Sequence, residues 1–247
     1  MRKQDFLLLL AFIATGIGFI KCSVGNVGNV NTYQFTLAVV DHNKNPGRTT
    51  IGTEHGFFAA PSLKGQYSYP DDCIFIKEFT VDLDNQPSSQ YYTATNVVVD
   101  GIVDQLPLEI DDKIGIGGYT LPISDLAVRT HICYNGKLFI FAQSKDKNPE
   151  FRLVFDSTAV ETNGIKNLYL LAKQADSASS ESISIHAFDL LNLFQKYQRD
   201  TTIVVSSTSE ILDLKYVKAN LNYFSEFPTE GDPVKKTTGQ FDIYIFE

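Results

Sequence analysis

The chain has 247 residues, of which 43% are hydrophobic, and can therefore bury the core of one large β domain or two small ones. Its formal net charge of −8 argues against nucleic acid as a partner and against charge-driven binding to an anionic membrane, because both targets are themselves negative.

The first 22 residues form an export signal. Arg2 and Lys3 precede an unbroken apolar run over residues 6–20, which ends at Lys21. Such a run spans about 22 Å as a helix, less than the roughly 30 Å of a hydrocarbon core, so a retained membrane helix is the weakest interpretation. Removing this segment takes away three bases and one acid and changes the formal charge from −8 to −10. We therefore expect a secreted protein or one of the cell envelope or outer surface.

The end of the signal leaves two outcomes open. A basic start, an apolar run, Cys22, Ser23 and then a leader rich in Gly and Asn over residues 23–31 resemble the layout of bacterial lipoproteins. That family has a small residue before its cysteine, whereas this chain has Lys21. The resemblance implies a lipid on Cys22. The alternative is cleavage after Gly16 or Gly25 and free secretion.

After the leader, the sequence predicts a β domain over residues 32–247. Alternating or β-branched runs bounded by turn-forming residues predict its strands. They lie at residues 33–39, 73–83, 96–103, 151–155, 182–188, 201–206, 211–217 and 240–246. The apolar spacing of residues 165–175 suits either a helix or a strand. Turn-forming residues lie on both sides and leave room only for a short element, which favours a strand. The absence of a βαβ rhythm predicts an antiparallel β-sandwich, or two in tandem divided near residues 144–149.

Two local elements have clear signals. Asn135 and Gly136 separate the apolar runs 131–134 and 137–141, and this dipeptide accepts the positive φ angles of a tight hairpin turn. Residues 189–197 start with a capping Asp189 and then carry apolar side chains at the spacing of one helical face, which predicts a single short helix.

The last predicted strand, residues 240–246, alternates strictly between apolar and polar side chains. Such a strand either docks into the sheet of its own chain or pairs with another subunit. The second case would make the protein a structural subunit that assembles through its C-terminal strand.

Two cysteines remain if Cys22 is lipidated or removed. Cys73 and Cys133 each lie in a strand-like run and could close one disulfide in an oxidising compartment. The alternative is that both are small buried core residues.

Acidic and glycine-rich segments do not complete a known site. Asp82 and Asp84 start like a calcium loop, but the sixth position is Pro87 instead of Gly. The acidic pairs 71–72 and 111–112 are adjacent, so on a strand their side chains point to opposite faces. The segment 115–120 lacks the third glycine of a dinucleotide loop and predicts a tight turn.

Histidines do not complete a catalytic or metal site either. Only His131 has another candidate ligand at close spacing, Cys133, and no third ligand is visible for this pair. The chain has no Gly-X-Ser-X-Gly, His-Glu-X-X-His or Cys-X-X-Cys motif. The sequence therefore favours a protein that is not an enzyme and has no cofactor, although a site assembled from distant residues stays open.

Tyrosines are the best candidates for ligand contacts. Tyr67, Tyr69, Tyr91 and Tyr92 lie in turn-like segments, where exposed rings suit recognition. The alternative is that they pack against the ends of the sheets. The leading hypothesis is an exported, non-enzymatic protein for binding or adhesion with a protein or glycan ligand. The others are a carbohydrate-binding or glycan-active β protein and the strand-paired homo-oligomer.

Overall fold

The computed structural model describes residues 29–41, 49–67, 72–86, 91–111, 114–128, 132–134, 136–145, 149–158, 164–174, 182–197, 199–205 and 210–246. The export signal, Cys22 and most of the leader lie outside these residues. Among the described residues, no helix has the length and apolar character needed to cross a membrane.

The first part of the chain forms a small closed barrel. It contains β1 (Val30–Asp41), β2 (Thr50–Thr53), β3 (Gly56–Ala59), the 3₁₀ helix η1 (Pro61–Leu63), β4 (Asp72–Asp82) and β5 (Tyr92–Ile102). The strand order is β1-β2-β3-β5-β4, and β1 and β4 pair antiparallel to close the barrel. The contact between β3 and β5 is parallel. A five-stranded barrel with this order has the topology of the OB-fold.

The second part forms a larger, mixed sheet. It contains β6 (Asp104–Asp111), β7 (Ile123–Val128), β8 (Ile132–Tyr134), β9 (Lys137–Ser144), β10 (Glu150–Asp156), β11 (Lys166–Lys173), β12 (Ser182–Asp189), α2 (Leu191–Tyr197), β13 (Arg199–Val205), β14 (Glu210–Glu226) and β15 (Val234–Phe246). The order is β11-β10-β6-β12-β9-β8-β15-β14-β13, with β7 beside β9. A parallel pairing of β11 with β14 joins distant strands of this order, so the sheet curls into a second barrel.

These sheets confirm the all-β class with one short helix, but they do not confirm a sandwich. A sandwich needs two open sheets face to face, whereas here each sheet closes or nearly closes on itself. The larger sheet also contains parallel pairs, such as β6 with β10, so it is not purely antiparallel. The chain passes from one barrel to the other at Val103, while residues 144–149 connect β9 and β10 within one sheet.

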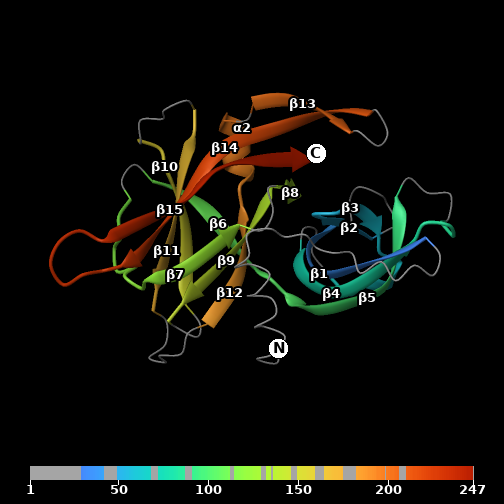
Figure 1. The fold of residues 1–247 in the computed structure, drawn as a ribbon, viewed down its shortest axis with the longest axis horizontal. Helices are drawn as coiled ribbons and strands as arrows, with labels where there is room; N and C mark the ends of the chain where they lie inside the picture. The colour runs from blue at the N-terminus through green and yellow to red at the C-terminus, as the bar shows by residue number, and fades with distance from the viewer. Residues whose placement is uncertain are drawn as a thin grey trace.

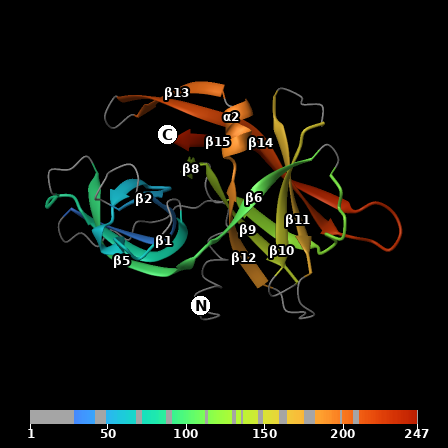
Figure 2. The same cartoon turned by 180° about the vertical axis from the view of Figure 1, so that it is seen from behind.

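The two barrels share an apolar core. Side chains of β1 and β4, including Leu37 and Phe75, pack in one cluster with Phe139 and Phe141 of β9. Val103, between β5 and β6, lies in the same cluster, and its backbone N–H donates to the carbonyl of Cys73 at 2.8 Å. Figures 1 and 2 show the barrels side by side, with β5 continuing directly into β6. Val103 thus anchors the passage between the barrels in this shared core.

The predicted hairpin and helix are both confirmed, and they touch. Tyr134 pairs with Lys137 across a turn in which Gly136 has a φ of 73°. The Asp189 carboxylate accepts the N–H of Leu191 at 2.9 Å, which caps α2. The carbonyl of Gly136 accepts the N–H of Leu190 at 2.7 Å, so the hairpin turn anchors the start of the helix. The ambiguous segment 165–175 is a strand, β11.

The C-terminal strand is docked. β15 pairs antiparallel with β14 and, at residues 244–246, parallel with β8. Its buried side chains Phe241 and Ile243 belong to the core of the larger barrel. Residues 244 and 245 of β15 are therefore paired on both sides within their own sheet.

Candidate functional site

The structure separates the predicted tyrosines. Tyr69 lies outside the described residues. Tyr67 follows η1 and packs against the core of the small barrel, where burial and then the nearby Asp72 raise the pKa of its phenol. Tyr91 and Tyr92 lie at the start of β5, and only Tyr92 is largely exposed, at 53%. The prediction of a tyrosine site stays untested, and Tyr92 is its best-placed member.

The face that OB-folds commonly use for ligands is covered here. That face lies over strands 2 and 3 of the barrel. Every residue of β2 is buried, and Phe57 of β3 packs against the apolar cluster shared with β9 and β12. The Tyr91 ring lies 6.3 Å from the Phe57 ring, at the margin of this contact. Contact with the second barrel thus involves Phe57 on this face of the small barrel.

The edge of β5 is open. β5 pairs with β4 along most of its length, but its contact with β3 involves only Tyr92 and Thr93. Residues 94–102 therefore have no strand beside them on the second side among the described residues. We call this segment the β5 edge. In Figure 1, β5 runs along the margin of the small barrel.

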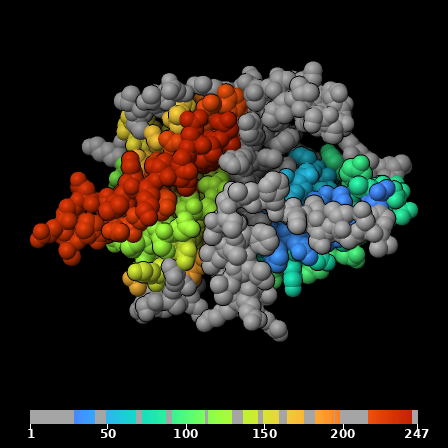
Figure 3. Space-filling view, viewed as in Figure 1, coloured from blue at the N-terminus to red at the C-terminus, as the bar shows by residue number. Residues whose placement is uncertain are grey.

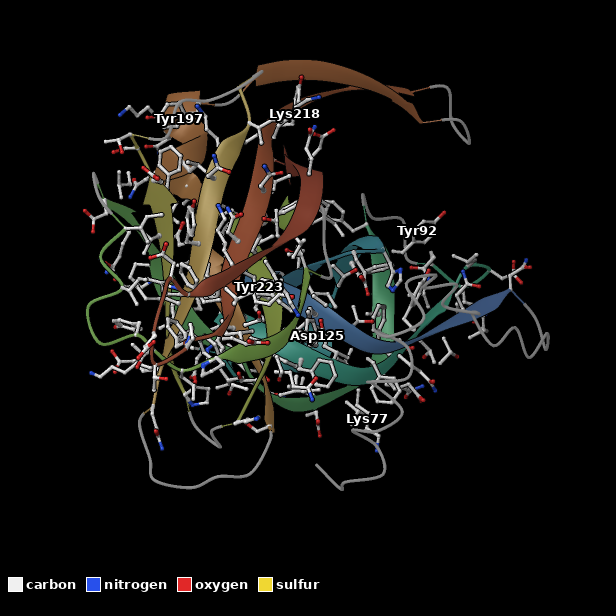
Figure 4. The ribbon with its side chains drawn as sticks, turned by 60° about the vertical axis from the view of Figure 1, so that its left-hand side comes forward. Lys77, Tyr92, Asp125, Tyr197, Lys218 and Tyr223 are labelled. Carbon is white, nitrogen blue, oxygen red and sulfur yellow. The ribbon has the colours of Figure 1, made fainter. Side chains whose placement is uncertain are left out.

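Apolar side chains gather on the same strand. Of the seven large hydrophobic side chains that are exposed among the described residues, β5 carries three: Tyr92, Val98 at 49% and Ile102 at 69%. Asp100 is also exposed. Figure 4 shows Tyr92, at the start of β5, and Lys77, on the neighbouring β4, on opposite sides of the small barrel. An open backbone edge with exposed apolar side chains can accept an added strand.

The irregular backbone of β5 limits this edge. Asn96 has a φ of 52°, and the pairing of β5 with β4 shifts register three times. The Asn96 amide donates to the Thr80 hydroxyl at 3.2 Å, which holds the irregular residue in place. Two of the three shifts lie within residues 98–101, so the β5 edge itself is irregular around Asp100.

No catalytic or metal site emerges from the acids and histidines that can be described. The described residues contain no group of three His, Cys, Asp or Glu side chains able to hold a metal ion. The Asp82 carboxylate instead accepts the side-chain amide of Asn85 at 2.8 Å and the backbone N–H groups of Asp84 and Asn85, and these hydrogen bonds, the side-chain one first, lower its pKa. His42 and His131 lie outside the described residues, and His55 stacks on Tyr33 with ring centroids 4.7 Å apart.

His186 is the most unusual histidine. It lies on β12 beside Phe151, with ring centroids 4.8 Å apart, and neither of its ring nitrogens has a hydrogen-bond partner in the described structure. Burial lowers its pKa, and the nearby Asp104 opposes this only in part. The His186 ring packs against the rings of Phe151 and Phe188, the second with its centroid 6.4 Å away.

Of the three cysteines, only Cys73 has a side chain that the structure describes. Cys73 is fully buried in the cluster between the barrels. Cys133 belongs to β8, but its side chain lies outside the described part of the chain, and no disulfide is present among the side chains that are described. The pairing of Cys73 with Cys133 stays a prediction, as does the lipid on Cys22.

Sequence reasoning missed the β5 edge. The run Val97-Val98-Val99 indicates a strand, but its composition does not tell whether Val98 faces a core or solvent. The same holds for Ile102, whose neighbour Val103 is buried. The nearest signal is Asp100, a charge inside an otherwise apolar run.

No family model and no curated protein sequence matches the chain. Solved structures do resemble it. A candidate lipoprotein from Bacteroides fragilis NCTC 9343 has a TM-score of 0.53 at 13% identity and covers 87% of this chain and 97% of its own. A protein from Parabacteroides merdae ATCC 43184 has a TM-score of 0.58 at 15% identity and covers 85% and 98%. A NigD-like immunity protein from Bacteroides caccae ATCC 43185 has a TM-score of 0.43 at 14% identity and covers 85% and 92%. At these identities the two likenesses above 0.5 show the fold alone, a pair of β barrels within one chain.

Proposed function

We propose that the protein is an exported, non-enzymatic binding protein that holds an extended polypeptide along the β5 edge. The apolar run 6–20 after a basic start supports export, and the likeness to a candidate lipoprotein is consistent with it. Its place is the cell envelope or the outside of the cell, with Cys22 as the candidate lipid attachment point.

The observation that carries this proposal is the open edge of β5 beside exposed Val98 and Ile102. Backbone hydrogen bonds from an added strand would satisfy the edge and supply affinity, while its side chains would cover the exposed apolar groups and supply specificity. Adhesion to a protein surface is one use of such a site.

An array of extended peptides tests the proposal. We expect the purified mature protein to bind a subset with alternating apolar residues. The double substitution Val98→Lys and Ile102→Lys should weaken that binding at least tenfold, because it places charge at both exposed apolar positions. Leu191→Lys is a matched control, since Leu191 is equally apolar, 40% exposed and on α2 of the other barrel. Equal binding by the wild type and the double variant would contradict the proposal.

A glycan ligand is the second candidate, and the exposed ring of Tyr92 favours it. A glycan array probed with and without calcium tests it. Binding that is lost in Tyr92→Ala and kept in the Val98→Lys and Ile102→Lys variant would assign the ligand to the tyrosine end of β5. A blank array would exclude this candidate.

The tether is tested separately by the intact mass of the protein from its native host. A lipid on Cys22 adds the mass of its acyl chains to a chain that begins at that residue. A mass that matches a chain cleaved after Gly16 or Gly25 and carrying no lipid would instead show free secretion. The same spectrum reports the Cys73–Cys133 bridge as a loss of two hydrogens.

A further inference from the structure

His186 lies where β12 first meets β6. β12 pairs with β9 along its whole length, but its parallel pairing with β6 begins only at His186, opposite Asp104. Residues 182–185 therefore have a paired strand on one side only among the described residues. Residues 182–186 are half-buried, and part of this orange segment reaches the surface in Figure 3. This end of β12 is thus held by fewer contacts than the rest of the strand.

The His186 ring occupies an apolar site. Its neighbours Phe151 and Phe188 belong to the core of the larger barrel, and neither ring nitrogen has a hydrogen-bond partner in the described structure. A charged imidazolium in this site would lose its hydration without gaining an acceptor, which is unfavourable. Burial accordingly lowers the pKa of His186. The site therefore holds the neutral ring.

Among the described charges on β12 and its neighbouring strands, one acts on this ring. Against the effect of burial, Asp104 raises the pKa of His186. On β9, the residues that lie opposite, 138–142, are all apolar. The other charged side chains nearby pair elsewhere: Asp189 with Lys137, Glu150 with Lys173, and Arg152 with Glu109 and Asp111. A proton on His186 would therefore have its counter-ion at Asp104.

The opposite face of β12 joins the two barrels. Ala187 is fully buried in the cluster that the barrels share, and Ile183 and Ile185 pack against this cluster. Asp104 directly follows Val103, which belongs to the same cluster. A movement of β12 at His186 would therefore reach the contact between the barrels.

We propose that His186 is an acid-sensitive switch: on taking up a proton its ring leaves the site beside Phe151 and turns to the Asp104 carboxylate, and residues 182–186 separate from the contact between the barrels. Asp104 is exposed, so a ring that leaves the core stays hydrated beside it. Residues 182–185 follow, because β9 alone holds them. This inference is independent of binding at the β5 edge.

The direction of the pH effect follows from the two forms. In the open form, the ring is in water and has at least the usual pKa of 6.5, whereas in the closed form burial lowers that pKa. Opening therefore takes up a proton and becomes more favourable as pH falls below 6.5. Between pH 7.5 and 5.5, the ratio of open to closed molecules should rise about three- to tenfold.

Hydrogen exchange followed by mass spectrometry tests the switch on the mature protein. Protection factors, which correct for the effect of pH on the intrinsic exchange rate, are compared at pH 7.5 and 5.5. We expect protection over residues 182–188 to fall about three- to tenfold and protection over residues 168–172 of β11 to stay constant. His186→Gln should abolish the fall. His55→Gln is the matched control and should keep it, because His55 lies in the small barrel, stacked on Tyr33.

Substitution of Asp104 tests the counter-ion. Asp104→Asn should move the onset of opening to lower pH, and Asp104→Glu should retain most of the wild-type response. An equal loss of protection in β11 would show global acid unfolding, and an unchanged response in His186→Gln would place the titrating group elsewhere; either result overturns the proposal. If His186→Gln does not fold, nuclear magnetic resonance of the wild type decides. A His186 ring that titrates at 6.5 or above while the amides of β12 stay unchanged would also overturn it.

Discussion

The contact between the hairpin turn and α2 allows a sharp test of how the larger barrel is held together. Gly136 has a φ of 73°, and a Cβ atom added there would lie 2.7 Å from Leu191 Cγ and 3.2 Å from its backbone nitrogen. Gly136→Ala therefore imposes two costs. The left-handed backbone costs about 1–2 kcal/mol for a residue with a Cβ atom. Overpacking against the start of α2 adds about 1–3 kcal/mol.

Gly231 separates the two costs. It has a φ of 95°, and a Cβ atom added there would meet nothing within 4 Å. Gly231→Ala should therefore show only the backbone cost, and urea unfolding followed by far-ultraviolet circular dichroism should place Gly136→Ala about 1–3 kcal/mol below it. Adding Leu191→Ala should recover part of that difference, because it removes the overlapping side-chain atoms. Equal destabilisation by the two glycine substitutions would refute the proposed contact between turn and helix.

Three further substitutions test other contacts. Asp189→Ala removes the cap of α2 and leaves the buried Lys137 ammonium without the carboxylate 2.8 Å away, so it should cost about 3 kcal/mol in urea unfolding. Phe141→Ala opens a void between the barrels and should cost about 3–5 kcal/mol in the same assay, against less than about 0.5 for the exposed Tyr92→Ala. Burial lowers the pKa of His186 from the usual 6.5, so the folded protein binds fewer protons than the unfolded chain and loses stability as pH falls through 6.5 towards the folded pKa. His186→Gln should flatten this pH dependence by up to about 1.4 kcal/mol per pH unit, and an unchanged profile would contradict the burial.

Local elements were predictable because neighbouring residues carry their signals. Asp189 with the apolar spacing after it indicates α2, and the Asn135-Gly136 dipeptide indicates the hairpin. The sequence did not predict β6, because Pro107 and several acidic residues are typical of a turn. In the structure this strand lies between β10 and β12. β2 and β3 escaped because each has only four residues and contains a glycine.

Barrel closure depends on contacts that no local pattern encodes. Leu168 of β11 pairs in parallel with Leu221 of β14, and these residues are far apart in the chain. Alternation within either strand is the same in a sandwich and in a barrel, because both bury one face of each strand. The candidate site depends on the same contacts: the brief pairing of Tyr92 and Thr93 with β3 leaves the rest of β5 open.

A peptide added along the β5 edge would form only a short ladder, because the pairing of β5 with β4 shifts register within residues 98–101. In dilute solution, a contact of this size competes poorly with the loss of translational freedom on association. A lipid on Cys22 would hold the protein at a surface and raise its effective concentration towards a ligand on that surface, as a linker does for a second binding site. The leader after Cys22 is rich in Gly and Asn, a composition that gives reach without a fixed orientation. Export, a tether and an open strand edge would then support one another.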